Sequence, residues 1–489
     1  MTPVTIFDTK QRKKIPFTPI DPNLVKFYSC GPTTYDFLHV GNARALVVGD
    51  IIFRALKSCG YNVDFVRNFT DVDDKIIEKA KERNIDAIEH SSQFIDECLQ
   101  DMGSLNLLPS THTPKVSETM DEIIQFIEGL EEKSFAYEVD GEVLFHVPEF
   151  KEYGKLSGRK LEELQHGKRV EVAAHKKHPS DFVLWKPAKD GGPSWDSKWG
   201  KGRPGWHIEC SAMAKKFLGE SIDIHHGGVD LIFPHHENEV AQSEALNEKP
   251  FVNHWCHNEF VNFSKEKMSK SLGNVITIRE FVETYSGMIL RFLVGSVHYR
   301  SKLEWTEDAI DRAINEVDRI HQFVSNWDDL KKSQSGLPLK DEEGLVKSIS
   351  DLHSKMIQEL ASDFNIPSAL SEFFTGIRLL NREVIQNKCQ LSVNASEKID
   401  LFIEGFKNAT GLVHDDPKNV LTELNELRRS RNDNDSKLKA EDIDSLIVER
   451  KTARAAKDWK RADEIRDILN NEGVVVKDNP DGTVSWSYE

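Results

Sequence analysis

The sequence predicts an α/β protein in which a parallel-sheet domain, split by an insertion, is followed by a mainly α-helical C-terminal region. Residues 25–30 have the composition of a strand, apolar residues recur with helical spacing over residues 42–58, and residues 61–68 alternate like a second strand. This β-α-β unit is typical of a parallel, Rossmann-like sheet. Similar patterns return from residue 205 onward, and beyond residue 305 the pattern is helical almost throughout.

The composition limits the class of protein. At 489 residues the chain is too long for one ordinary core, so several domains are expected. Charged residues make up 30%, no apolar run approaches the roughly 18 residues that a membrane span needs, and the N-terminus has no secretory pattern. We therefore expect a cytoplasmic protein, with most of its six scattered cysteines reduced. The net charge of −17 argues against non-specific nucleic-acid binding but allows a local basic surface.

The junction between the first strand and the first helix carries side chains suited to a nucleotide site. Ligands of a parallel sheet bind at the carboxyl ends of its strands, and the amides of a helix N-terminus favour phosphate. This junction contains a candidate metal ligand, Cys30, a hydrogen-bonding imidazole, His39, and Gly41, which leaves space for a flat ring. A G-x-G-x-x-G pattern does not follow the first strand, which argues against an NAD enzyme.

The segment after the second strand lies at the same edge of the sheet. Thr70 stands there in a position to line a cleft, and we expect it to contribute to a site. Two interpretations stay open for Asp73 and Asp74: they line the same cleft, or they begin a helix, whose dipole favours acidic residues. Residues 86–133 then have a helical pattern.

The middle of the chain has the pattern of an insertion between two halves of a sheet. Residues 137–201 are rich in turns and include strand-like pieces at 141–147 and 181–185. The sheet pattern resumes with a helix start at 205–213 and a strand at 221–228. Further expected elements are a helix with Pro234 as its first residue, a strand at residues 260–263 and a basic loop at 265–274.

The C-terminal region is divided by polar segments. Residues 331–336 form a linker or exposed loop, and the helices over 347–410 are interrupted at 365–367. The low-complexity run 428–436 is expected to be a loop or disordered. A single helix over about 444–471 is expected to lead into two short strands at 473–477 and 483–486.

Four candidate metal ligands are distributed along the chain: Cys30, Cys210, His235 and Glu239. A spacing of four places His235 and Glu239 on one face of a helix, and two thiolates, an imidazole and a carboxylate suit Zn²⁺. Spacing alone leaves open an alternative, in which the cysteines are merely buried and the helix is a solvated polar one. The neighbouring His236 and Glu237 are expected to point to another face.

Taken together, the motifs resemble the cysteinyl-tRNA synthetase family of class I aminoacyl-tRNA synthetases, and the resemblance runs essentially from end to end. It is carried by segments 30–33, 67–75, 205–213 and 233–239, by His39-Val40-Gly41-Asn42 in place of the "HIGH" signature, and by an intact Lys267-Met268-Ser269-Lys270-Ser271. The resemblance implies one zinc ion per chain, held by Cys30, Cys210, His235 and Glu239. It also implies ATP, with Mg²⁺, as a substrate.

The resemblance further implies which residues act in the reaction. L-Cysteine would be activated with ATP to an adenylate, with release of pyrophosphate, and then transferred to the 3′ end of tRNA(Cys). The catalytic residues would be His39, Lys267 and Lys270, and the ATP-binding residues His39, Gly41, Asn42 and Lys270. Asn42 replaces the second histidine of "HIGH"; a neutral amide can still donate a hydrogen bond, so we expect altered detail rather than inactivity.

Selection of cysteine against serine is the hardest demand on such a pocket, because the two differ only by S for O. Zinc would meet it by favouring a thiolate. The expected walls of the amino-acid pocket are Thr70, Trp206, His207 and His225, although core packing remains an alternative for Trp206. With such a zinc site, the insertion need not be an editing domain.

In residues 449–466 basic side chains outnumber acidic ones, which reverses the global charge. A charge run is usually a solvated face; the resemblance favours contact with tRNA through Arg450, Arg454, Lys457 and Trp459, whose indole can stack on a base. The expected partners are tRNA(Cys), L-cysteine and ATP, and a monomer is expected. Two rivals remain: a related ligase that attaches cysteine to an amino sugar but lacks the long C-terminal half, and a non-catalytic paralogue.

The expected division of the chain has six parts. Two halves of a catalytic domain, at 1–133 and 205–262, enclose the connective insertion at 134–204. A region at 263–330 with the Lys267–Ser271 motif would contact the tRNA stem. A helical bundle of anticodon-binding type at 331–425 and a small C-terminal domain at 426–489 would follow.

Overall fold

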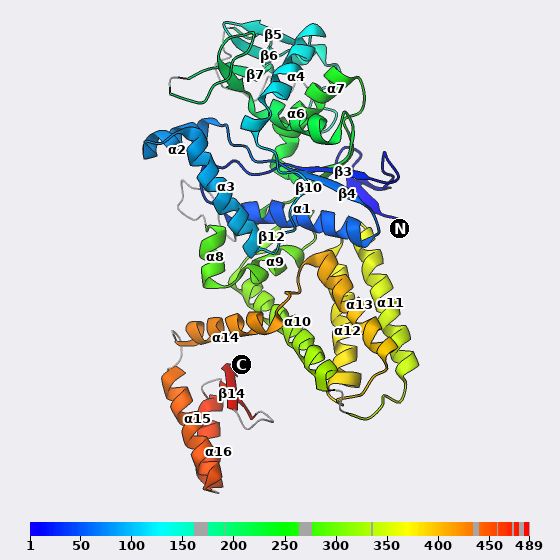
Figure 1. The fold of residues 1–489 in the computed structure, drawn as a ribbon, viewed down its shortest axis with the longest axis vertical. Coiled ribbons are helices and arrows are strands. Elements are labelled where there is room, and N and C mark those ends of the chain that lie inside the picture. The colour runs from blue at the N-terminus through cyan, green and yellow to red at the C-terminus, as the bar shows by residue number, and fades with distance from the viewer. Residues whose placement is uncertain are drawn as a thin grey trace.

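The computed structural model describes residues 1–160, 175–189, 191–263, 276–333, 336–433, 440–456, 458–471, 474–478 and 484–488. The molecule is elongated, with the insertion at one end, a parallel sheet in the middle and the helical region at the other end (Figure 1). Among the described residues, no helix combines the length and the apolar character needed to cross a bilayer.

The central sheet has the strand order β10-β9-β3-β4, and its pairings are parallel. Its strands are β3 (Val25–Ser29), β4 (Val63–Arg67), β9 (Ile222–Gly228) and β10 (Val252–Asn258). Successive side chains of β3 face opposite sides: Phe27 stacks on Phe65 in the core beneath the helical region, whereas Tyr28 and Val66 belong to the core beneath the insertion. The sheet therefore separates two hydrophobic cores.

Helix α1 (Val40–Ser58) connects β3 to β4 and lies between the sheet and the helices α9 (Gly287–Gly295), α11 (Glu342–Ala361) and α13 (Val393–Thr410) (Figure 1). Helix α1 places charged side chains in this core. The fully buried Asp50 accepts from Arg54 Nε at 2.7 Å, from the buried Arg291 of α9 and from the Leu108 N–H. Arg291 also donates to the carbonyl of Thr410 at the end of α13. These bonds fix α1 to the helical region.

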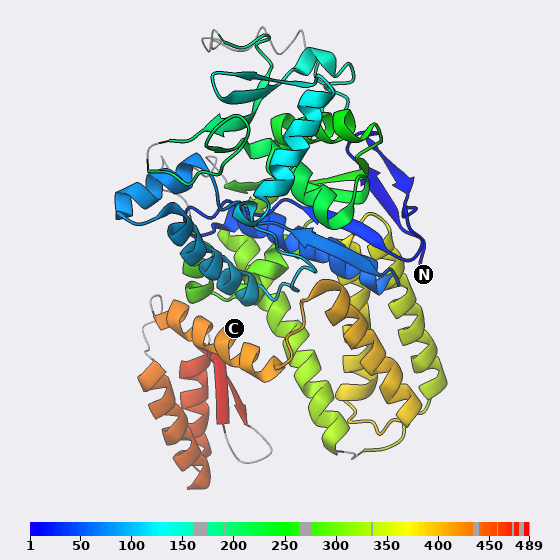
Figure 2. The same ribbon diagram turned by 45° about the horizontal axis from the view of Figure 1, so that its top comes forward.

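The insertion covers the other face of the sheet. Its antiparallel sheet consists of β5 (Ala136–Val139), β6 (Glu142–Phe145), β7 (Phe182–Pro187) and β8 (Gly202–Pro204). The helices that cover this face of the sheet or lie next to it are α2 (Asp74–Arg83), α3 (Ala87–Ser104), α4 (Met120–Glu132), α6 (Trp206–Leu218) and α7 (Glu237–Asn247). An N-terminal hairpin, β1 (Thr5–Asp8) and β2 (Lys13–Pro16), packs beside β10 at the sheet edge (Figure 2).

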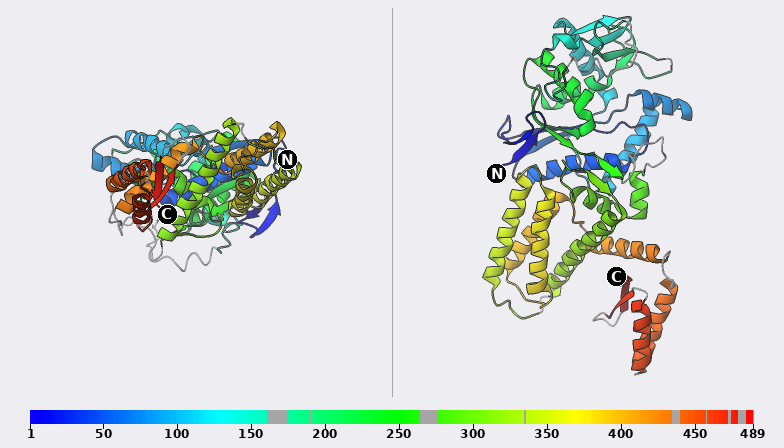
Figure 3. Two further views of the ribbon diagram at one scale, coloured as in Figure 1. Left: turned by 90° about the horizontal axis from the view of Figure 1, so that it is seen from below. Right: turned by 180° about the vertical axis from the view of Figure 1, so that it is seen from behind.

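The helical region begins after β11 (Val261–Phe263), which pairs in parallel with β12 (Leu303–Trp305); the first two helices of the region lie between these strands in the sequence. Its further helices are α8 (Ile278–Thr284), α10 (Glu307–Ser333), α12 (Ile366–Leu380), α14 (Pro417–Asp433), α15 (Ala440–Ala455) and α16 (Trp459–Asn471). The last two helices and the antiparallel strands β13 (Val474–Asp478) and β14 (Val484–Tyr488) lie at the end of the molecule remote from the insertion (Figure 3).

Two expectations for the C-terminal region are wrong. The run 428–436 is not a loop over 428–433, because α14 continues to Asp433; Arg428 and Arg431 pair with Asp318 and Asp311 of α10, which stabilises this polar helix. The single helix over 444–471 is two helices, α15 and α16. The Asp458 side chain accepts the N–H of Arg461, which begins the second helix.

One error concerns the second half of the sheet. Strand β10 was not predicted, because it is buried on both faces and lacks the alternation of a half-exposed strand. The helix predicted to start at Pro234 is present in outline. Phe233 is extended (φ −141°, ψ 130°), the helical backbone resumes after it in the π-helical turn Ile232–His236, and α7 continues from Glu237.

Replacing Asp50 with asparagine is expected to destabilise the protein by about 3–5 kcal/mol, because Arg54 and Arg291 would stay buried without a counter-charge. Denaturant unfolding measures the difference. The matched control is Glu82→Gln, which breaks an exposed pair with Lys79 at 2.7 Å and should cost less than about 1 kcal/mol. Equal losses in the two variants would contradict this prediction.

The contribution of Asp50 should also depend on pH. Burial alone would raise the pKa of Asp50, but Arg291 and Arg54 hold that pKa below its usual value. A carboxyl whose pKa is lower in the folded state stabilises the protein above its unfolded pKa, about 3.9, and this stability is lost as the pH falls towards the folded value. The difference in unfolding free energy between wild type and Asp50→Asn is therefore expected to shrink below about pH 4.

Candidate metal centre and nucleotide cavity

The loop between β3 and α1 is fixed by close contacts with the two neighbouring strands. A Cβ on Gly31 would lie 1.5 Å from the carbonyl oxygen of Asn68, so only glycine fits, and the Gly31 N–H donates to Asn68 Oδ1 at 2.9 Å. On the other side, the Cys30 N–H donates to the carbonyl of His226 in β9 at 3.1 Å. Cys30 is therefore held at the carboxyl end of the sheet.

The start of α1 is closed by a reciprocal cap. His39 Nδ1 accepts the N–H of Asn42 at 3.2 Å, and Asn42 Oδ1 accepts the N–H of His39 at 3.1 Å. A Cβ on Gly41 would lie 2.9 Å from the His39 ring. The residue that departs from the "HIGH" signature thus completes the helix cap, a use that sequence reasoning did not find.

Hydrogen bonds at two places connect α1 to the opposite wall of the site. The Val40 N–H donates to the carbonyl of Ile276 at 3.0 Å, and the Ile278 N–H donates to the carbonyl of Leu38 at 2.8 Å. The buried Arg44 of α1 donates to the carbonyl of Glu259 at 2.8 Å, and also to those of His298, Tyr299 and Ser301. Lys267 and Lys270 fall in the 264–275 stretch, outside the described residues.

A cavity of about 630 Å³ connects the end of β3 with the start of α1. The predicted site residues on its wall are Cys30, His39, Gly41, Asn42, Thr70, Trp206, Cys210 and His235. Sequence reasoning missed the wall formed by residues 258–263 and Lys302. The position of Asn258 at the carboxyl end of a parallel strand would have indicated it, had β10 been recognised.

The four predicted metal ligands converge at one end of this cavity. Their donor atoms, from Cys30, Cys210, His235 and Glu239, all lie within 4.8 Å of one another. The two sulfur atoms are 3.9 Å apart, and His235 Nε2 is 3.1 Å from Glu239 Oε1. Cys210, His235 and Glu239 are buried, and Cys30 is half-buried. Buried cysteines scattered at random would not meet a buried carboxylate in this way.

The surroundings of the candidate ligands favour the charged forms of Cys210 and Glu239. A hydrogen bond with Cys30 lowers the pKa of Cys210 to about 6, whereas burial raises the pKa of Cys30. Burial alone would raise the pKa of Glu239, but His225 and His235 lower it to about 2. A thiolate and a carboxylate are therefore available at neutral pH. Burial alone would lower the pKa of His235, but Glu239 and Cys210 raise it to about 10, so the buried negative charge draws positive charge to the same place.

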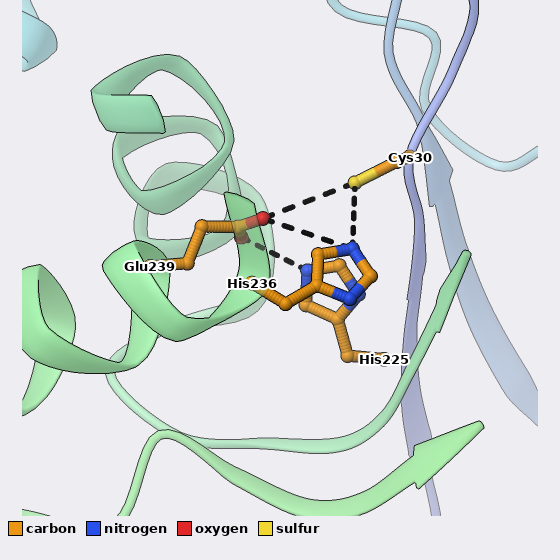
Figure 4. A group of neighbouring side chains, drawn as sticks. All are labelled: Cys30, His225, His236 and Glu239. Carbon is orange, nitrogen blue, oxygen red and sulfur yellow. Dashed lines mark hydrogen bonds and ion pairs between the residues drawn. The ribbon is translucent and has the colours of Figure 1, made fainter. Parts of the chain in front are cut away.

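A second, overlapping group of donors shares Cys30 and Glu239 and adds His225 and His236 (Figure 4). His236 Nε2 lies 3.4 Å from Cys30 Sγ, and His225 Nε2 lies 2.9 Å from Glu239 Oε2. The expectation that His236 points to another face is wrong. His236 lies at the end of the π-helical turn and three residues before Glu239, and its ring points to the same group of donors. Glu237 does point elsewhere, towards the insertion.

Two of the residues expected to form the amino-acid pocket, His207 and His225, do not line the cavity. His207 Nδ1 lies 3.0 Å from His235 Nδ1, so it contacts a candidate ligand from behind. The fully buried His225 stacks on Trp255 and hydrogen-bonds to Glu239. Trp206 is 42% exposed and packs against His235, which places it on the open side of the candidate metal centre.

The donor set fits a zinc ion. Two sulfur ligands, an imidazole and a carboxylate suit this borderline-soft ion, and the sulfur and ring atoms are near enough to close around one ion. A hydrogen bond from a second imidazole to the ligating carboxylate is the usual outer support of such a site.

Comparison with known proteins assigns the family. Residues 16–315 match the family described as tRNA synthetases class I (C) catalytic domain, and residues 439–486 match the cysteinyl-tRNA ligase anticodon binding domain. Relatives named cysteine–tRNA ligase from Halalkalibacterium halodurans and Geobacter sulfurreducens are each 44% identical to this chain, over 99% of both chains. The chain belongs to the cysteine–tRNA ligase family.

Solved structures of other synthetases share the fold. A LeuRS from Agrobacterium radiobacter, in a ternary complex with tRNA and LeuAMS, has a TM-score of 0.58 at 10% identity, over 83% of this chain and 86% of that chain. A methionyl-tRNA synthetase from Mycobacterium tuberculosis in complex with methionyl-adenylate has a TM-score of 0.57 at 14% identity, over 82% and 93%. The predicted fold class, α/β with a mainly helical C-terminal region, is confirmed.

In this cysteine–tRNA ligase family member, the segment matched by the anticodon-binding family carries the expected tRNA contacts. Arg450 and Arg454 lie on α15, and Trp459 begins α16 with 59% of its surface exposed. Lys457 lies outside the described residues. Part of the basic excess is neutralised within the segment, because Arg461 pairs with Glu449 at 2.9 Å. The assignment of these contacts stays a prediction.

Cys210→Ser is expected to lose most of its bound zinc, because a hydroxyl does not supply the thiolate that the site offers at neutral pH. Zinc per chain, measured by elemental analysis after dialysis, is the readout. Cys389→Ser is the matched control, since Cys389 lies outside the cluster and should leave the zinc content unchanged. Full zinc retention in Cys210→Ser would rule out this ligand set.

Proposed function

We propose that the protein joins the carboxylate of L-cysteine to the α-phosphate of ATP, releasing pyrophosphate, and then transfers the cysteinyl group to the 3′ end of tRNA(Cys), releasing AMP. One observation carries this proposal: the cluster of Cys30, Cys210, His235 and Glu239 and the N-terminus of α1 open into the same cavity. A thiol held at the first would bring its own carboxylate towards a phosphate held at the second. The relatives named cysteine–tRNA ligase support this reading.

The nucleotide end of the cavity relies on α1. Because His39 Nδ1 accepts the N–H of Asn42, the neutral ring carries its proton on Nε2, and this tautomer can donate to a phosphate oxygen. The helix dipole adds stabilisation for negative charge. Gly41 leaves space for adenine, and Asn42 holds the cap. Lys267 and Lys270, with Mg²⁺, would neutralise the leaving pyrophosphate, and the protein would act mainly by positioning and charge stabilisation.

The amino-acid end of the cavity relies on the metal centre. Cys30, Cys210, His235 and Glu239 would hold zinc, which, when bound, supplies a preference for the thiolate of cysteine over the hydroxyl of serine. Thr70 and Trp206 form walls beside this end. His225 and His207 act from behind: the first holds the Glu239 carboxylate, and the second contacts the His235 ring.

The tRNA would bind along the helical region. This proposal includes the six-part division of the chain and tRNA contacts through Arg450, Arg454, Lys457 and Trp459. Their support is the match of residues 439–486 to an anticodon-binding domain. A ligase that uses an amino sugar as acceptor has no need of this segment.

Cysteine-dependent ATP–pyrophosphate exchange by the zinc-loaded protein is the direct test. We expect exchange with cysteine and rates with serine lower by at least about 1,000-fold, a larger factor than the roughly 10–200-fold that an apolar pocket alone achieves for such a small difference. Addition of tRNA(Cys) should yield an acylated 3′ end. Activation of serine at a rate near that of cysteine would contradict the role assigned to zinc, and acylation of an amino sugar instead of tRNA would favour the rival ligase.

Lys270→Ala is expected to slow cysteine-dependent exchange by about 100-fold or more, because a charge that stabilises the leaving pyrophosphate typically contributes several kcal/mol in the transition state. The affinity for cysteine should stay close to that of wild type. Lys302→Ala is the comparison variant, because Lys302 lies on the wall of the cavity. Near-normal exchange by Lys270→Ala would remove this residue from the reaction.

A further inference from the structure

Glu237 stands between two candidate zinc ligands, His235 and Glu239, but its carboxylate faces the other way. It is fully buried. It accepts backbone N–H groups from Gly154 at 3.0 Å and from Ser157 at 2.7 Å, and a longer one from Leu156 at 3.4 Å. All three donors belong to one short segment of the insertion, residues 153–159, here called the insertion loop. A buried carboxylate is stable only with such partners, so this contact is built into the fold.

The insertion loop is shaped to hold an anion. Gly154 has a φ of +97°, and a Cβ there would lie 1.9 Å from the carbonyl oxygen of Arg159, so the loop closes tightly on itself at a glycine. The Gly158 N–H donates to the Gly154 carbonyl at 2.8 Å, which closes the turn. Successive backbone N–H groups that point into such a turn form a nest for negative charge. The Glu237 carboxylate occupies this nest.

The same loop contacts the neighbours of Glu237. Tyr153 Oη donates to Asn238 Oδ1 at 2.5 Å, and the Arg159 guanidinium lies 4.3 Å from the centre of the Phe233 ring. The insertion loop therefore contacts the chain on both sides of His235. Both His235 and Glu239 lie within two residues of a position that the loop holds.

This support acts at the start of the helix that carries the ligands. His235 belongs to the π-helical turn Ile232–His236, Glu239 lies in the first turn of α7, and Phe233, two residues before His235, leaves helical geometry. The helical backbone sets the four-residue spacing of His235 and Glu239. Because Phe233 is extended, the helix is not continued on its N-terminal side, and the insertion loop supplies contacts there and at Glu237 and Asn238.

We propose that the insertion loop is a further outer support of the zinc centre, in addition to His225 and His207, with Glu237 and Tyr153 as positioning residues that orient His235 and Glu239. This inference rests on the zinc part of the proposed function. It gives the insertion a role in selecting the amino acid: the residues that carry the metal are on the sheet domain, and the groups that hold them in place are on the insertion. Loss of a partner that is hydrogen-bonded to a ligand typically weakens metal binding by about 10–100-fold, and Glu237 and Tyr153 act through neighbouring residues, so we expect the lower end of this range.

Glu237→Gln is the main variant, because the side chain keeps its shape while an NH₂ group replaces one oxygen and meets N–H donors. The zinc dissociation constant is measured by competition with a chromophoric chelator, and the absorption spectrum of the Co²⁺-loaded protein reports the ligand geometry. We expect zinc affinity to fall by about 10-fold, the lower end of the range for outer partners, and the Co²⁺ bands to shift. Tyr153→Phe, which loses a single hydrogen bond, should change both readouts in the same direction and by less.

Glu244→Gln is the matched control. Glu244 is on the same helix and also contacts the insertion loop, through Lys155, but it lies beyond the ligands. Its zinc affinity and Co²⁺ spectrum should match those of wild type. An equal loss in Glu244→Gln and Glu237→Gln would overturn the proposal, because it would mean that general loosening of the insertion weakens the site.

The remaining outcomes are also decisive. A folded Glu237→Gln protein with wild-type zinc affinity and an unchanged Co²⁺ spectrum overturns the inference. If circular dichroism shows that Glu237→Gln does not fold, Tyr153→Phe decides: unchanged affinity and spectrum overturn the inference, and a shift in both supports it. A wild-type protein that binds no stoichiometric zinc is a different failure, since it removes the zinc centre from the proposed function itself.

Discussion

Buried charged residues on α1 hold the helix in one position relative to the far wall of the cavity and to the helical region. Arg44 donates to four backbone carbonyls on the segments that form the far wall of the cavity, and Asp50 binds two arginines that reach the helical region. Charges in such a core are tolerated only when their partners stay in place, so any sliding of α1 would leave several polar groups unsatisfied. The N-terminus of α1, with His39 and Asn42, is thereby set at a fixed distance from the wall opposite.

The metal end of the cavity depends on a different set of restraints. Cys30 is fixed by the sheet, Cys210 by α6, and His235 and Glu239 by a turn that the insertion loop supports. Three segments far apart in the sequence thus meet at one point. Glu239 is central to this arrangement, since it contacts His225 and His235 at once and belongs to both overlapping groups of donors. The zinc selectivity proposed for the site would follow from this convergence and not from any single motif.

The sequence was most informative where chemistry restricts the residue. Gly41 and the four candidate ligands were all singled out from residue type and motif, and the structure brings the ligands together. It was least informative where packing decides. Strand β10 has no alternation because both its faces are buried, and α14 extends through a polar run because α10 supplies acidic partners. Such partners lie more than a hundred residues away, beyond the reach of a local pattern.

Sequence alone therefore determined the family, the α/β class and the chemical types of the residues at the site, because these depend on local composition and on motifs that few side chains can replace. The orientation of those residues was decided by tertiary structure. Asn42 became a helix cap, His236 turned towards Cys30, and Glu237 turned away into the insertion loop. In each case adjacent positions in the chain face different partners, and only the packed molecule supplies the donors and acceptors that a buried polar group must find.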